Sequence, residues 1–387
     1  MKIFLVTSSR ADFGLLKNLI FKLNKTSNFD LKIITTGSHF SKKHGFSFGE
    51  IKSHKIRIYK KILISNNTKS SISLLNDMNI LSKSISSLIK KDNPDLFIVL
   101  GDRYEVFAIT LAAYLERITI AHIHGGELTQ GSLDDGFRHC ITKMSNFHFV
   151  TNKIYKKRII QLGENPNSIY NVGSLGTENI SKTNFFSKKD LQKYLRINFK
   201  KNILLVCIHP EITKELTINL ADETIQALND YDNKTIIFTM PGSDLFNDII
   251  FDKIGRLIKK KTNCYLFKNL GSQKYLSLLR IADAIIGNSS SGILEMPIFG
   301  KPTINIGYRQ EGRIKTKSII DVPPNRFMIK KAIDYIYQNK INKLNYLNYK
   351  NDKNVSNKIV SILKKINIKK YKIKKFYDIP QSNKYGK

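Results

Sequence analysis

The chain has 387 residues, of which 41% are hydrophobic and 25% charged, and its 64 Lys+Arg against 31 Asp+Glu give a formal net charge of +33. This hydrophobic content supplies buried cores, which excludes a mainly disordered protein, and the length favours two domains. The lysines are spread along the chain without a nucleic-acid recognition motif, so we interpret the charge as a compositional bias and expect no nucleic-acid partner.

The cysteines and the N-terminal stretch point to a cytoplasmic protein. Cys140, Cys207 and Cys264 lack the paired spacing of a disulfide framework or a zinc site, which fits a reducing compartment. The stretch MKIFLVTSSRAD has a short apolar run followed by polar residues, as in a first strand and unlike a signal peptide. No run reaches membrane-spanning length, so we expect no membrane insertion.

Apolar runs alternate with helical periodicity through the first half of the chain. The predicted strands are KIFLVT, LKIITTG, LFIVLGD, ITIAHIHGG and FHFVT. Between and after them we predict helices over 12–24, 72–91 and 104–116, one from about 135, and one that ends at 162. Continuous apolar strands that alternate with helices predict a parallel sheet covered on both faces.

The alternation pauses over 173–201, which is polar and uneven, and resumes with NILLVCIHP. The second series continues with TIIFTMPGSD, CYLFKN, a helix that ends near 281, DAIIGNSSSG and PTINIG. We therefore predict an α/β fold of two Rossmann-like doubly wound domains, 1–177 and 178–364, with a basic C-terminal helix at about 365–387 that packs back on the first domain. Ligands of such sheets bind in the cleft outside the carboxyl ends of the strands.

Polar residues follow two strands of the first half. TSSRADFG follows the first strand, where Arg10 is placed to face an anion, although Asp12 as a helix cap would explain the motif without a function. GDRYE follows LFIVL and places Asp102 and Arg103 at a strand end, where Gly101 permits close approach of a ligand. A surface loop would carry the same charges. From its position we take Asp102 as the strongest catalytic candidate.

The stretch HIHGGELTQGSLDD follows the next strand. Side chains alternate along a strand, so His122 and His124 are predicted to face one side, and the glycines let Glu127 turn back over the sheet edge. Imidazoles and carboxylates that meet at a cleft are what proton abstraction and return require. Two alternatives stay open: Asp134 or Asp135 is only the N-cap of the next helix, or the cluster holds a metal, although its spacing matches no zinc pattern.

The second half offers groups suited to a nucleotide. GNSSSGILE follows DAIIG and begins a helix, so its hydroxyl and N–H groups form a predicted diphosphate cradle, with Glu295 one turn later to accept the ribose hydroxyls. A lone SSSG would be an ordinary capping turn, but at a strand-to-helix junction we favour the nucleotide. Two arginines of this half bring positive charge to a phosphate. The candidates of this half are Ser289, Ser290, Ser291, Gly292 and Glu295 with His209, Asp244, Arg309 and Arg313.

Together these motifs resemble the UDP-N-acetylglucosamine 2-epimerases of the glycosyltransferase-B fold, in particular the hydrolysing branch of sialic and legionaminic acid synthesis. The resemblance rests on TSSRADFG, GDRYE, HIHGGE, DDGFRHCITKMS, QLGENPNSIYNVGSLG, HPE, GNSSSGILE, NIGYRQEGR and FYDIP, in the expected order over nearly the entire chain. It implies that a base removes the C2 proton of a UDP-sugar, that UDP leaves C1, and that water adds to the resulting 2-acetamidoglycal. It implies no added cofactor, a homo-oligomer (dimer or tetramer), and UDP and N-acetylmannosamine as products, with UDP-2,4-diacetamido-2,4,6-trideoxyglucose as the alternative substrate.

The resemblance assigns roles to matching positions. Asp102 matches the family's acidic residue after the fourth strand, and Asp134 and Asp135 match an acidic pair of which one acts with it. The implied nucleotide contacts are Arg10, His209, Ser289, Ser290, Glu295 and Arg309. Many relatives have H-x-E where this chain has His-Ile-His, so either His124 takes the role of the second carboxylate or Glu127 supplies it. Many also have Asn where this chain has Gly242, two residues before Asp244.

Two other functions compete with this interpretation. A glycosyltransferase of the same fold would share the nucleotide half, and it would release UDP only when an acceptor is present. A polyanion-binding protein would explain the charge and the lysine-rich C-terminal segment, and it would show steep salt-dependent retention on heparin or DNA. The acids at strand ends favour the elimination chemistry.

Overall fold

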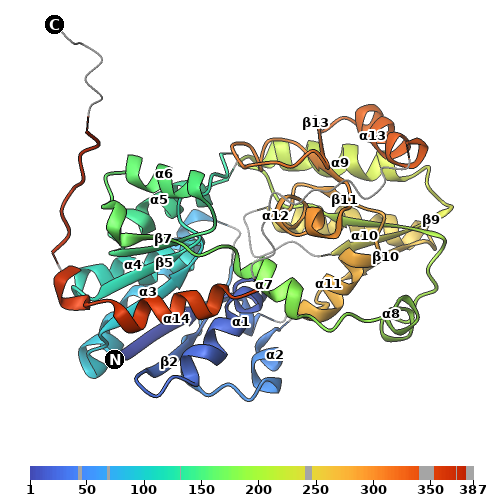
Figure 1. The fold of residues 1–387 in the computed structure, drawn as a ribbon. Helices are drawn as coiled ribbons and strands as arrows, with labels where there is room; N and C mark the ends of the chain where they lie inside the picture. The colour runs from blue at the N-terminus through green and yellow to red at the C-terminus, as the bar shows by residue number, and fades with distance from the viewer. Residues whose placement is uncertain are drawn as a thin grey trace, which may run out of the picture.

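The structure is a computed structural model that describes residues 1–41, 46–67, 70–130, 132–239, 246–339, 353–371 and 373–380. Its two halves, each built on a parallel sheet, lie side by side (Figure 1). This architecture confirms the predicted fold of two Rossmann-like units. Among the described helices, none combines the length and the apolar character that crossing a bilayer requires.

The first sheet has seven parallel strands in the order β3-β2-β1-β4-β5-β6-β7. Its strands are β1 (Lys2–Thr7), β2 (Asp30–Thr35), β3 (Ile58–Lys61), β4 (Leu96–Leu100), β5 (Thr119–Ile123), β6 (Phe147–Val150) and β7 (Ile169–Asn171). The helices of this half are α1 (Arg10–Asn24), α2 (Phe48–Ser53), α3 (Ser71–Asp92), α4 (Tyr104–Leu115), α5 (Asp134–Met144), α6 (Lys153–Gln161) and α7 (Leu175–Lys182). The strand order reverses between β1 and β4, which opens a crevice at their carboxyl ends.

The second sheet has six parallel strands in the order β10-β9-β8-β11-β12-β13, with its reversal between β8 and β11. Its strands are β8 (Asn202–Cys207), β9 (Lys234–Thr239), β10 (Cys264–Phe267), β11 (Ala284–Gly287), β12 (Thr303–Ile306) and β13 (Ile319–Val322). The helices around it are α8 (Lys188–Leu195), α9 (Lys214–Leu228), α10 (Asn247–Lys260), α11 (Gly271–Ile281), α12 (Ser290–Leu294) and α13 (Arg326–Gln338). The proposed domain boundary at 177/178 falls inside α7, whose first residues belong to the first core.

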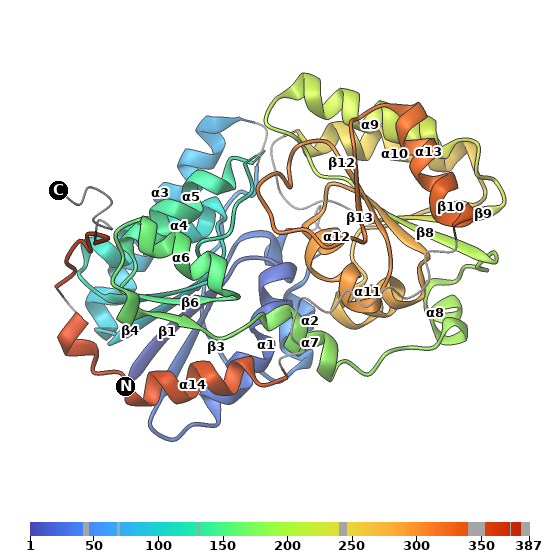
Figure 2. The ribbon, with the colours of Figure 1, turned by 45° about the horizontal axis from the view of Figure 1, so that its top comes forward.

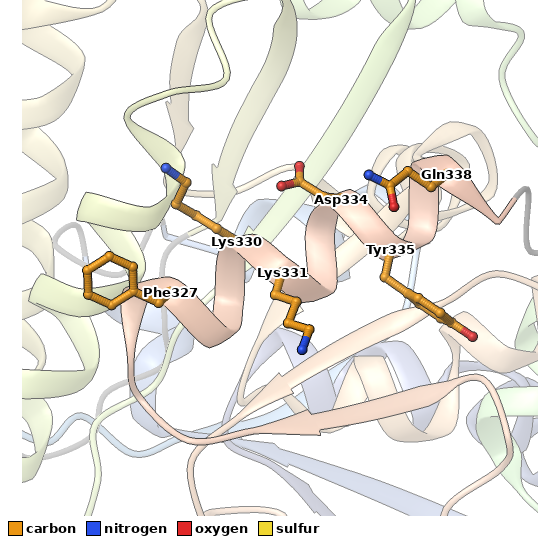
Figure 3. A pocket seen from close by; sticks show the side chains of 6 residues that line it. All are labelled: Phe327, Lys330, Lys331, Asp334, Tyr335 and Gln338. Atoms are coloured by element: carbon orange, nitrogen blue, oxygen red, sulfur yellow. The ribbon is translucent and has the colours of Figure 1, made fainter.

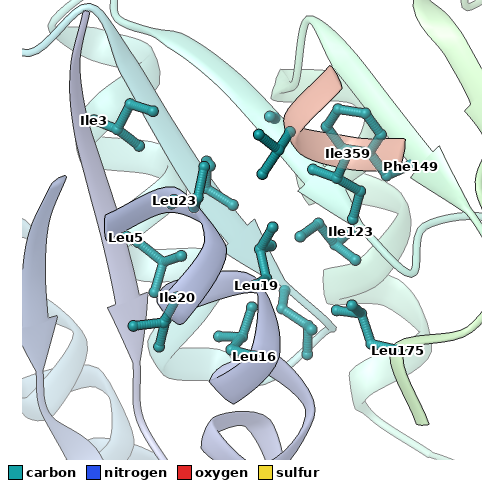
Figure 4. Close-up of a cluster of buried hydrophobic side chains, with 14 of the residues drawn as sticks. Ile3, Leu5, Leu16, Leu19, Ile20, Leu23, Ile123, Phe149, Leu175 and Ile359 are labelled. Carbon is teal, nitrogen blue, oxygen red and sulfur yellow. The ribbon is translucent and has the colours of Figure 1, made fainter. Parts of the chain in front are cut away.

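Each sheet is buried on both faces, as its continuous apolar strands require. One face of the first sheet packs under α1, where Leu16, Leu19 and Leu23 meet Ile3 and Leu5 (Figure 4). The opposite face packs under α3 and α4 in a separate apolar cluster, and the second sheet is covered in the same way. The strand ends, and not the strand faces, are therefore free to carry polar groups.

The chain returns to the first half at its C-terminal end. Helix α14 (Val355–Lys365) packs beside α1 and α7 (Figures 1 and 2), and its Ile359 joins the first core (Figure 4). Ser356 also donates its backbone N–H to the buried carboxylate of Glu178 at 2.9 Å. The predicted return is thus present, but over the described residues 366–371 and 373–380 the predicted helix at about 365–387 is wrong. The returning helix ends at Lys365, and beyond it the described chain has a short 3-10 turn (Ile368–Tyr371) and residues 373–380 without helix.

Candidate active site

A cleft lies where the carboxyl ends of the two sheets face each other, and it encloses a cavity of about 370 Å³. Turns after β1, β4 and β5 line it from the first half, and turns after β8 and β11 line it from the second. This is the crevice in which doubly wound sheets bind ligands. The predicted residues that line it are Arg10, Asp102, Arg103, His124, Glu127, Asp134, His209, Ser289, Ser290, Ser291, Glu295, Arg309 and Arg313.

Two other predicted residues do not line the cavity. Asp135 does not line the cavity: its Oδ1 accepts a hydrogen bond from the N–H of Thr129 at 2.5 Å and another from Nη1 of Arg138 at 3.1 Å. Gly292 faces β12, where an added Cβ would lie 2.6 Å from a methyl carbon, so this glycine serves close packing of helix on strand. Asp244 lies outside the described residues.

The start of α5 corrects one alternative drawn from the sequence. The helix begins at Asp134 and its N-cap is Leu133, whose side chain makes no capping bond, while the hydroxyl of Ser132 accepts from the N–H of Asp134 at 3.3 Å. The interpretation of Asp134 or Asp135 as the N-cap is therefore wrong. Both carboxylates lie inside the first turn, where the positive end of the helix dipole favours negative charge.

A neutral histidine, His122, holds the turn that carries Asp102 through a hydrogen bond to the backbone. Gly101 turns the chain with φ +85°, and its carbonyl oxygen lies 2.8 Å from Nε2 of His122. Because a carbonyl only accepts, Nε2 carries the ring proton, and Nδ1 accepts from the hydroxyl of Thr142 at 3.1 Å. Burial lowers the pKa of His122 to about 3, so the imidazole stays neutral at physiological pH. His122 is thus a support for Asp102.

His124 occupies a different environment from His122, although alternation predicted the same side for both. Strand β5 ends at Ile123, and His124 leaves it with φ +67°, so of the two histidines only His124 lines the cavity. Burial lowers the pKa of His124, and the nearby Glu127 carboxylate opposes that shift. Its Nε2 has no hydrogen-bond partner within the described part of the chain. A neutral imidazole with one uncommitted nitrogen therefore borders the cavity.

Glu127 links the two halves of the protein. Its Oε2 accepts from Nη1 of Arg313 at 2.8 Å, and its Oε1 lies 3.8 Å from Nδ1 of His124. The side chains of Glu127 and Arg313 are 5% and 7% exposed, so this ion pair is screened little by solvent. The carboxylate of Glu127 is therefore engaged by a guanidinium from the opposite half.

Arg138 is a site residue that the sequence analysis missed. It is 1% exposed and lines the cavity, with Nη2 paired to the carboxylate of Asp102 and Nη1 donating to the backbone carbonyl of Glu127 at 3.1 Å. Burial lowers its pKa, and the guanidinium of Arg313 adds to that effect. Since arginine keeps its charge in proteins, Arg138 is a buried cation beside the proposed catalytic acid. A signal was present, because Arg138 follows Asp134 and Asp135 by four and three residues, the spacing of one helix face.

The start of α1 is closed by a capping box between Ser9 and Asp12. Asp12 accepts from the N–H of Ser8 at 2.8 Å and from that of Ser9 at 3.1 Å, in a complete capping box. The capping alternative for Asp12 is therefore confirmed. Arg10 crosses the cleft, where its Nη1 donates to Oδ1 of Asn269 at 2.7 Å. Arg10 thus lies at the cavity and also joins the two halves.

The second half presents the SSSG turn to the cavity. Ser289 is the N-cap of α12 and accepts from the N–H of Ser291 at 3.3 Å. Asn288 ties β8 to β11, with bonds of 2.6 and 2.9 Å to the backbone N–H and carbonyl of His209. Burial raises the pKa of Glu295, and a bond from Ser291 opposes that shift. Hydroxyl groups and one half-buried carboxyl group thus line this wall.

The start of α11 and the region of α7 also line the cavity, and the sequence analysis missed both. The CYLFKN strand is followed by LGSQKY, which is another strand-to-helix turn, so the strand-end rule would have found the first set. Nothing comparable marks the second set, because it follows no predicted strand. The residues are Gly271, Ser272, Tyr275 and Leu276 near α11, and Ser174, Gly176 and Asn179 near α7.

A second depression, of about 420 Å³, lies on the outer side of α13 (Figure 3). All its lining residues come from that one helix, and Phe327 and Tyr335 are 68% and 51% exposed. No strand end reaches it, so it lacks the converging polar groups of the cleft. Over the described residues as a whole, no three His, Cys, Asp or Glu side chains cluster closely enough to hold a metal ion.

Comparison with known proteins assigns the chain that forms this cleft to a family. The family model described as UDP-N-acetylglucosamine 2-epimerase matches residues 21–364. The chain belongs to the UDP-N-acetylglucosamine 2-epimerase family. The cleft described above is thus the candidate active site of a member of this family, which agrees with the resemblance found in the motifs.

Several relatives span nearly the same length. The chain is 41% identical to the GDP/UDP-N,N'-diacetylbacillosamine 2-epimerase (hydrolyzing) of Campylobacter jejuni, over 98% of this chain and 99% of the relative. It is 35% identical to polysialic acid biosynthesis protein P7 of Escherichia coli, over 98% of each chain. It is 30% identical to the UDP-N,N'-diacetylbacillosamine 2-epimerase (hydrolyzing) of Legionella pneumophila, over 83% of this chain and 85% of the relative. The fold matches the Neisseria meningitidis UDP-GlcNAc 2-epimerase bound to UDP-GlcNAc with a TM-score of 0.79, at 18% identity over 95% of this chain and 100% of that one.

Proposed function

We propose that the protein is a hydrolysing 2-epimerase that converts a UDP-linked 2-acetamido sugar and water into UDP and the free sugar with inverted C2. One observation carries this proposal: acid–base groups of the first half and the SSSG turn of the second half line the same cavity. A nucleotide on the second wall would direct its sugar toward the first. The acid–base groups of the first half would then lie next to C1 and C2 of the sugar.

The elimination step needs a base at C2 and a stabilised leaving group at C1. The base takes the C2 proton, the electron pair of the C2–H bond forms the C1=C2 double bond, and the C1–O bond breaks as UDP departs. We assign the proton transfers at C2 to Asp102 and His124, from neighbouring strands, because inversion requires that one group remove a proton and another return one to the opposite face. In the hydration step neutral His124 takes a proton from water as the hydroxyl group joins C1, and it passes that proton to C2. Asp102 releases the proton that it took from C2 to solvent, so the balance is one water consumed for each UDP released.

Glu127 fits the second proton role less well than His124. Its carboxylate is neutralised by Arg313 at 2.8 Å, whereas Nε2 of His124 has no partner in the described regions. A proton carrier needs an atom that is not already committed to another group. We therefore propose His124 as the acid–base group that takes the place of the second carboxylate, with Glu127 orienting His124 and Arg313.

Positive charge is available for the departing diphosphate. Arg309 and Arg313 line the cavity on the nucleotide side, and Arg138 lies buried on the sugar side. Guanidinium groups in a cavity shielded from water stabilise charge that develops on a leaving group more strongly than they would in water. We propose that Arg309 and the serine hydroxyls bind the diphosphate before it leaves.

Two sugars remain candidates for the substrate. The motifs favoured UDP-N-acetylglucosamine, as does the family description. The names of two relatives, at 41% and 30% identity, support N,N'-diacetylbacillosamine, the 2,4-diacetamido-2,4,6-trideoxy sugar of the alternative. Because the relative at 41% identity aligns over 98% of the chain, we propose UDP-N,N'-diacetylbacillosamine as the first substrate to test and UDP-N-acetylglucosamine as the second. Either product would serve sialic-acid-type sugar synthesis.

UDP release without an acceptor tests the reaction class. The purified protein is incubated with each UDP-sugar alone, and free UDP is measured over time. The proposal expects UDP release from at least one of the two sugars and a higher kcat/KM for the diacetamido sugar. Release of UDP only after an acceptor sugar is added would instead identify a glycosyltransferase of this fold.

Ser290→Ala and Glu295→Ala are expected to weaken UDP binding. Hydrogen bonds that involve a charged group contribute about 1.5–3 kcal/mol, so each change should raise the Kd of UDP by roughly tenfold or more. Calorimetric titration with UDP measures the effect. Asp102→Asn is the matched control, because Asp102 lies on the opposite wall, and it should leave the Kd of UDP within about twofold of wild type. Unchanged Kd values in both serine and glutamate variants would contradict the proposed nucleotide wall.

A further inference from the structure

The chain that follows α14 crosses the end of α5 that lies away from the cleft. We define residues 373–377 as the C-terminal strap. Nζ of Lys374 donates to the backbone carbonyls of Thr142 at 3.4 Å and Ser145 at 2.6 Å, and also to that of Lys143. These carbonyls belong to the last turn of α5 and its C-cap, where a helix lacks internal donors and carries partial negative charge. Lys374 therefore acts as a cationic cap for α5.

A buried carboxylate holds the strap in place. Glu164 is 1% exposed, and its Oε2 lies 2.7 Å from Nζ of Lys374 and 3.1 Å from Nε2 of His148. Its Oε1 accepts from Nζ of Lys143 at 2.7 Å. Burial lowers the pKa of Lys374 to about 8 and Glu164 opposes that shift, so Lys374 is still charged at pH 7. The strap thus shares one carboxylate with α5 and β6.

A glycine on the first half gives the strap its second attachment. Gly163 has φ +80°, and a Cβ added there would lie 2.3 Å from the ring of Phe376. The backbone N–H of Tyr377 donates to the carbonyl of Gly163 at 2.9 Å, and Nζ of Lys143 lies 5.0 Å from the centre of the Phe376 ring. The FYDIP motif therefore has a structural partner in the turn after α6, and neither is among the residues that line the cavity.

Helix α5 connects the strap to the active site. Its first turns carry Asp134, which lines the cavity, and Arg138, which pairs with Asp102. Its other end is the one capped by Lys374. A helix of 11 residues is a stiff rod of about 16 Å at 1.5 Å per residue, so a shift at one end moves the other. Small displacements of catalytic groups lower turnover strongly.

We propose that Lys374 is a positioning residue, which acts through α5 to keep Arg138 and Asp102 in register with the substrate. The strap would then be a part of the catalytic machinery that lies outside the cleft. This inference rests on the proposed function for its kinetic consequence. Its structural content, the anchoring of α5, stands apart from the identity of the substrate.

The test compares four variants of the full chain: Lys374→Met, Lys374→Arg, Phe376→Ala and Lys375→Met. Lys375 is the matched control, because it is the exposed neighbour of Lys374 on the same strap. We expect Lys374→Met to lower kcat by about 10-fold to 100-fold with an unchanged Kd for UDP, since the nucleotide wall is not touched. Lys374→Arg should recover most of kcat, Phe376→Ala should show a smaller loss, and Lys375→Met should match wild type.

Hydrogen exchange separates the strap from the reaction. Backbone amides of α5 are expected to exchange faster in Lys374→Met than in Lys375→Met, whatever the substrate is. Equal α5 exchange in these two variants, or wild-type kcat in Lys374→Met, would overturn the inference. Should Lys374→Met fail to fold, Phe376→Ala carries the test, because its ring is 68% exposed and no core depends on it. A wild-type protein that turns over neither UDP-sugar would refute the proposed function and leave the exchange result as the test of the strap.

Discussion

Asp102→Asn is expected to lower kcat by about 10³-fold or more, because general acid–base groups contribute about 10²–10⁴-fold and this change also removes the negative charge that Arg138 faces. The amide keeps the size of the carboxyl group but cannot accept the C2 proton. The turn itself should survive, since His122 holds the carbonyl of Gly101 and not the side chain of Asp102. Steady-state release of UDP measures kcat, and calorimetry measures the Kd of UDP.

One outcome for Asp102→Asn would contradict the proposed catalytic role of Asp102. Wild-type turnover in Asp102→Asn would mean that the catalytic centre lies elsewhere in the cleft. Asp92→Asn is a suitable control, because Asp92 is another acid of the first half, at the end of α3 and absent from the cavity lining. It should retain wild-type kcat.

His124→Ala and Glu127→Gln should separate the two groups that the motif HIHGGE left open. For His124→Ala we expect a loss of kcat of about 10²–10³-fold with little change in the Kd of UDP, because the imidazole is proposed to carry a proton. For Glu127→Gln we expect a smaller loss of kcat, of about tenfold, together with lower stability. That stability loss arises because Arg313 would then be a buried cation without its carboxylate, and such changes cost several kcal/mol.

The pH dependence of activity is a second way to distinguish the roles of His124 and Glu127. Burial lowers the pKa of His124, so the wild-type imidazole is neutral at pH 7 and gains its proton only as the pH falls. Activity that depends on neutral His124 should therefore decline toward acid pH, and this limb should be lost from the residual activity of His124→Ala. If Glu127→Gln lost turnover as strongly as His124→Ala and abolished the same limb, the role would belong to Glu127.

The architecture followed from local patterns because each buried strand is a continuous apolar run. The predicted strands from KIFLVT to PTINIG are all present, and the carboxyl-end rule located most of the cavity. The strands that escaped prediction are edge or near-edge strands such as β3 and β13, which are short and half-buried and so lack a continuous apolar run. The polar stretch 173–201 hid α7 and α8. The apolar residues of α7 join a core of each half, and those of α8 join a core of the second half.

Long-range pairing could not be derived from the sequence. Arg138 and Asp102 are 36 residues apart in the sequence, and Arg313 and Glu127 are 186 residues apart. No local spacing in the sequence therefore predicts either pair. Arg313 was expected at a phosphate, and it lies at the cavity while paired to the other half. The prediction that His124 faces the same side as His122 was wrong for a local reason. The positive φ of His124 ends the alternation of side chains along the strand. The positions of strand ends therefore predict which residues line the cleft, whereas the ion pairs that these residues form can be identified only from the three-dimensional structure.

The most direct test of the proposed chemistry is proton NMR of the purified protein with each UDP-sugar in heavy water, without an acceptor. We expect that UDP accumulates together with the free 2-epimeric sugar and that the released sugar carries deuterium at C2. Deuterium at C2 requires that the C2–H bond was broken, which simple hydrolysis of the C1–O bond does not do. Release of an unepimerised sugar that retains its C2 proton would contradict the elimination mechanism and, with it, the roles of Asp102 and His124.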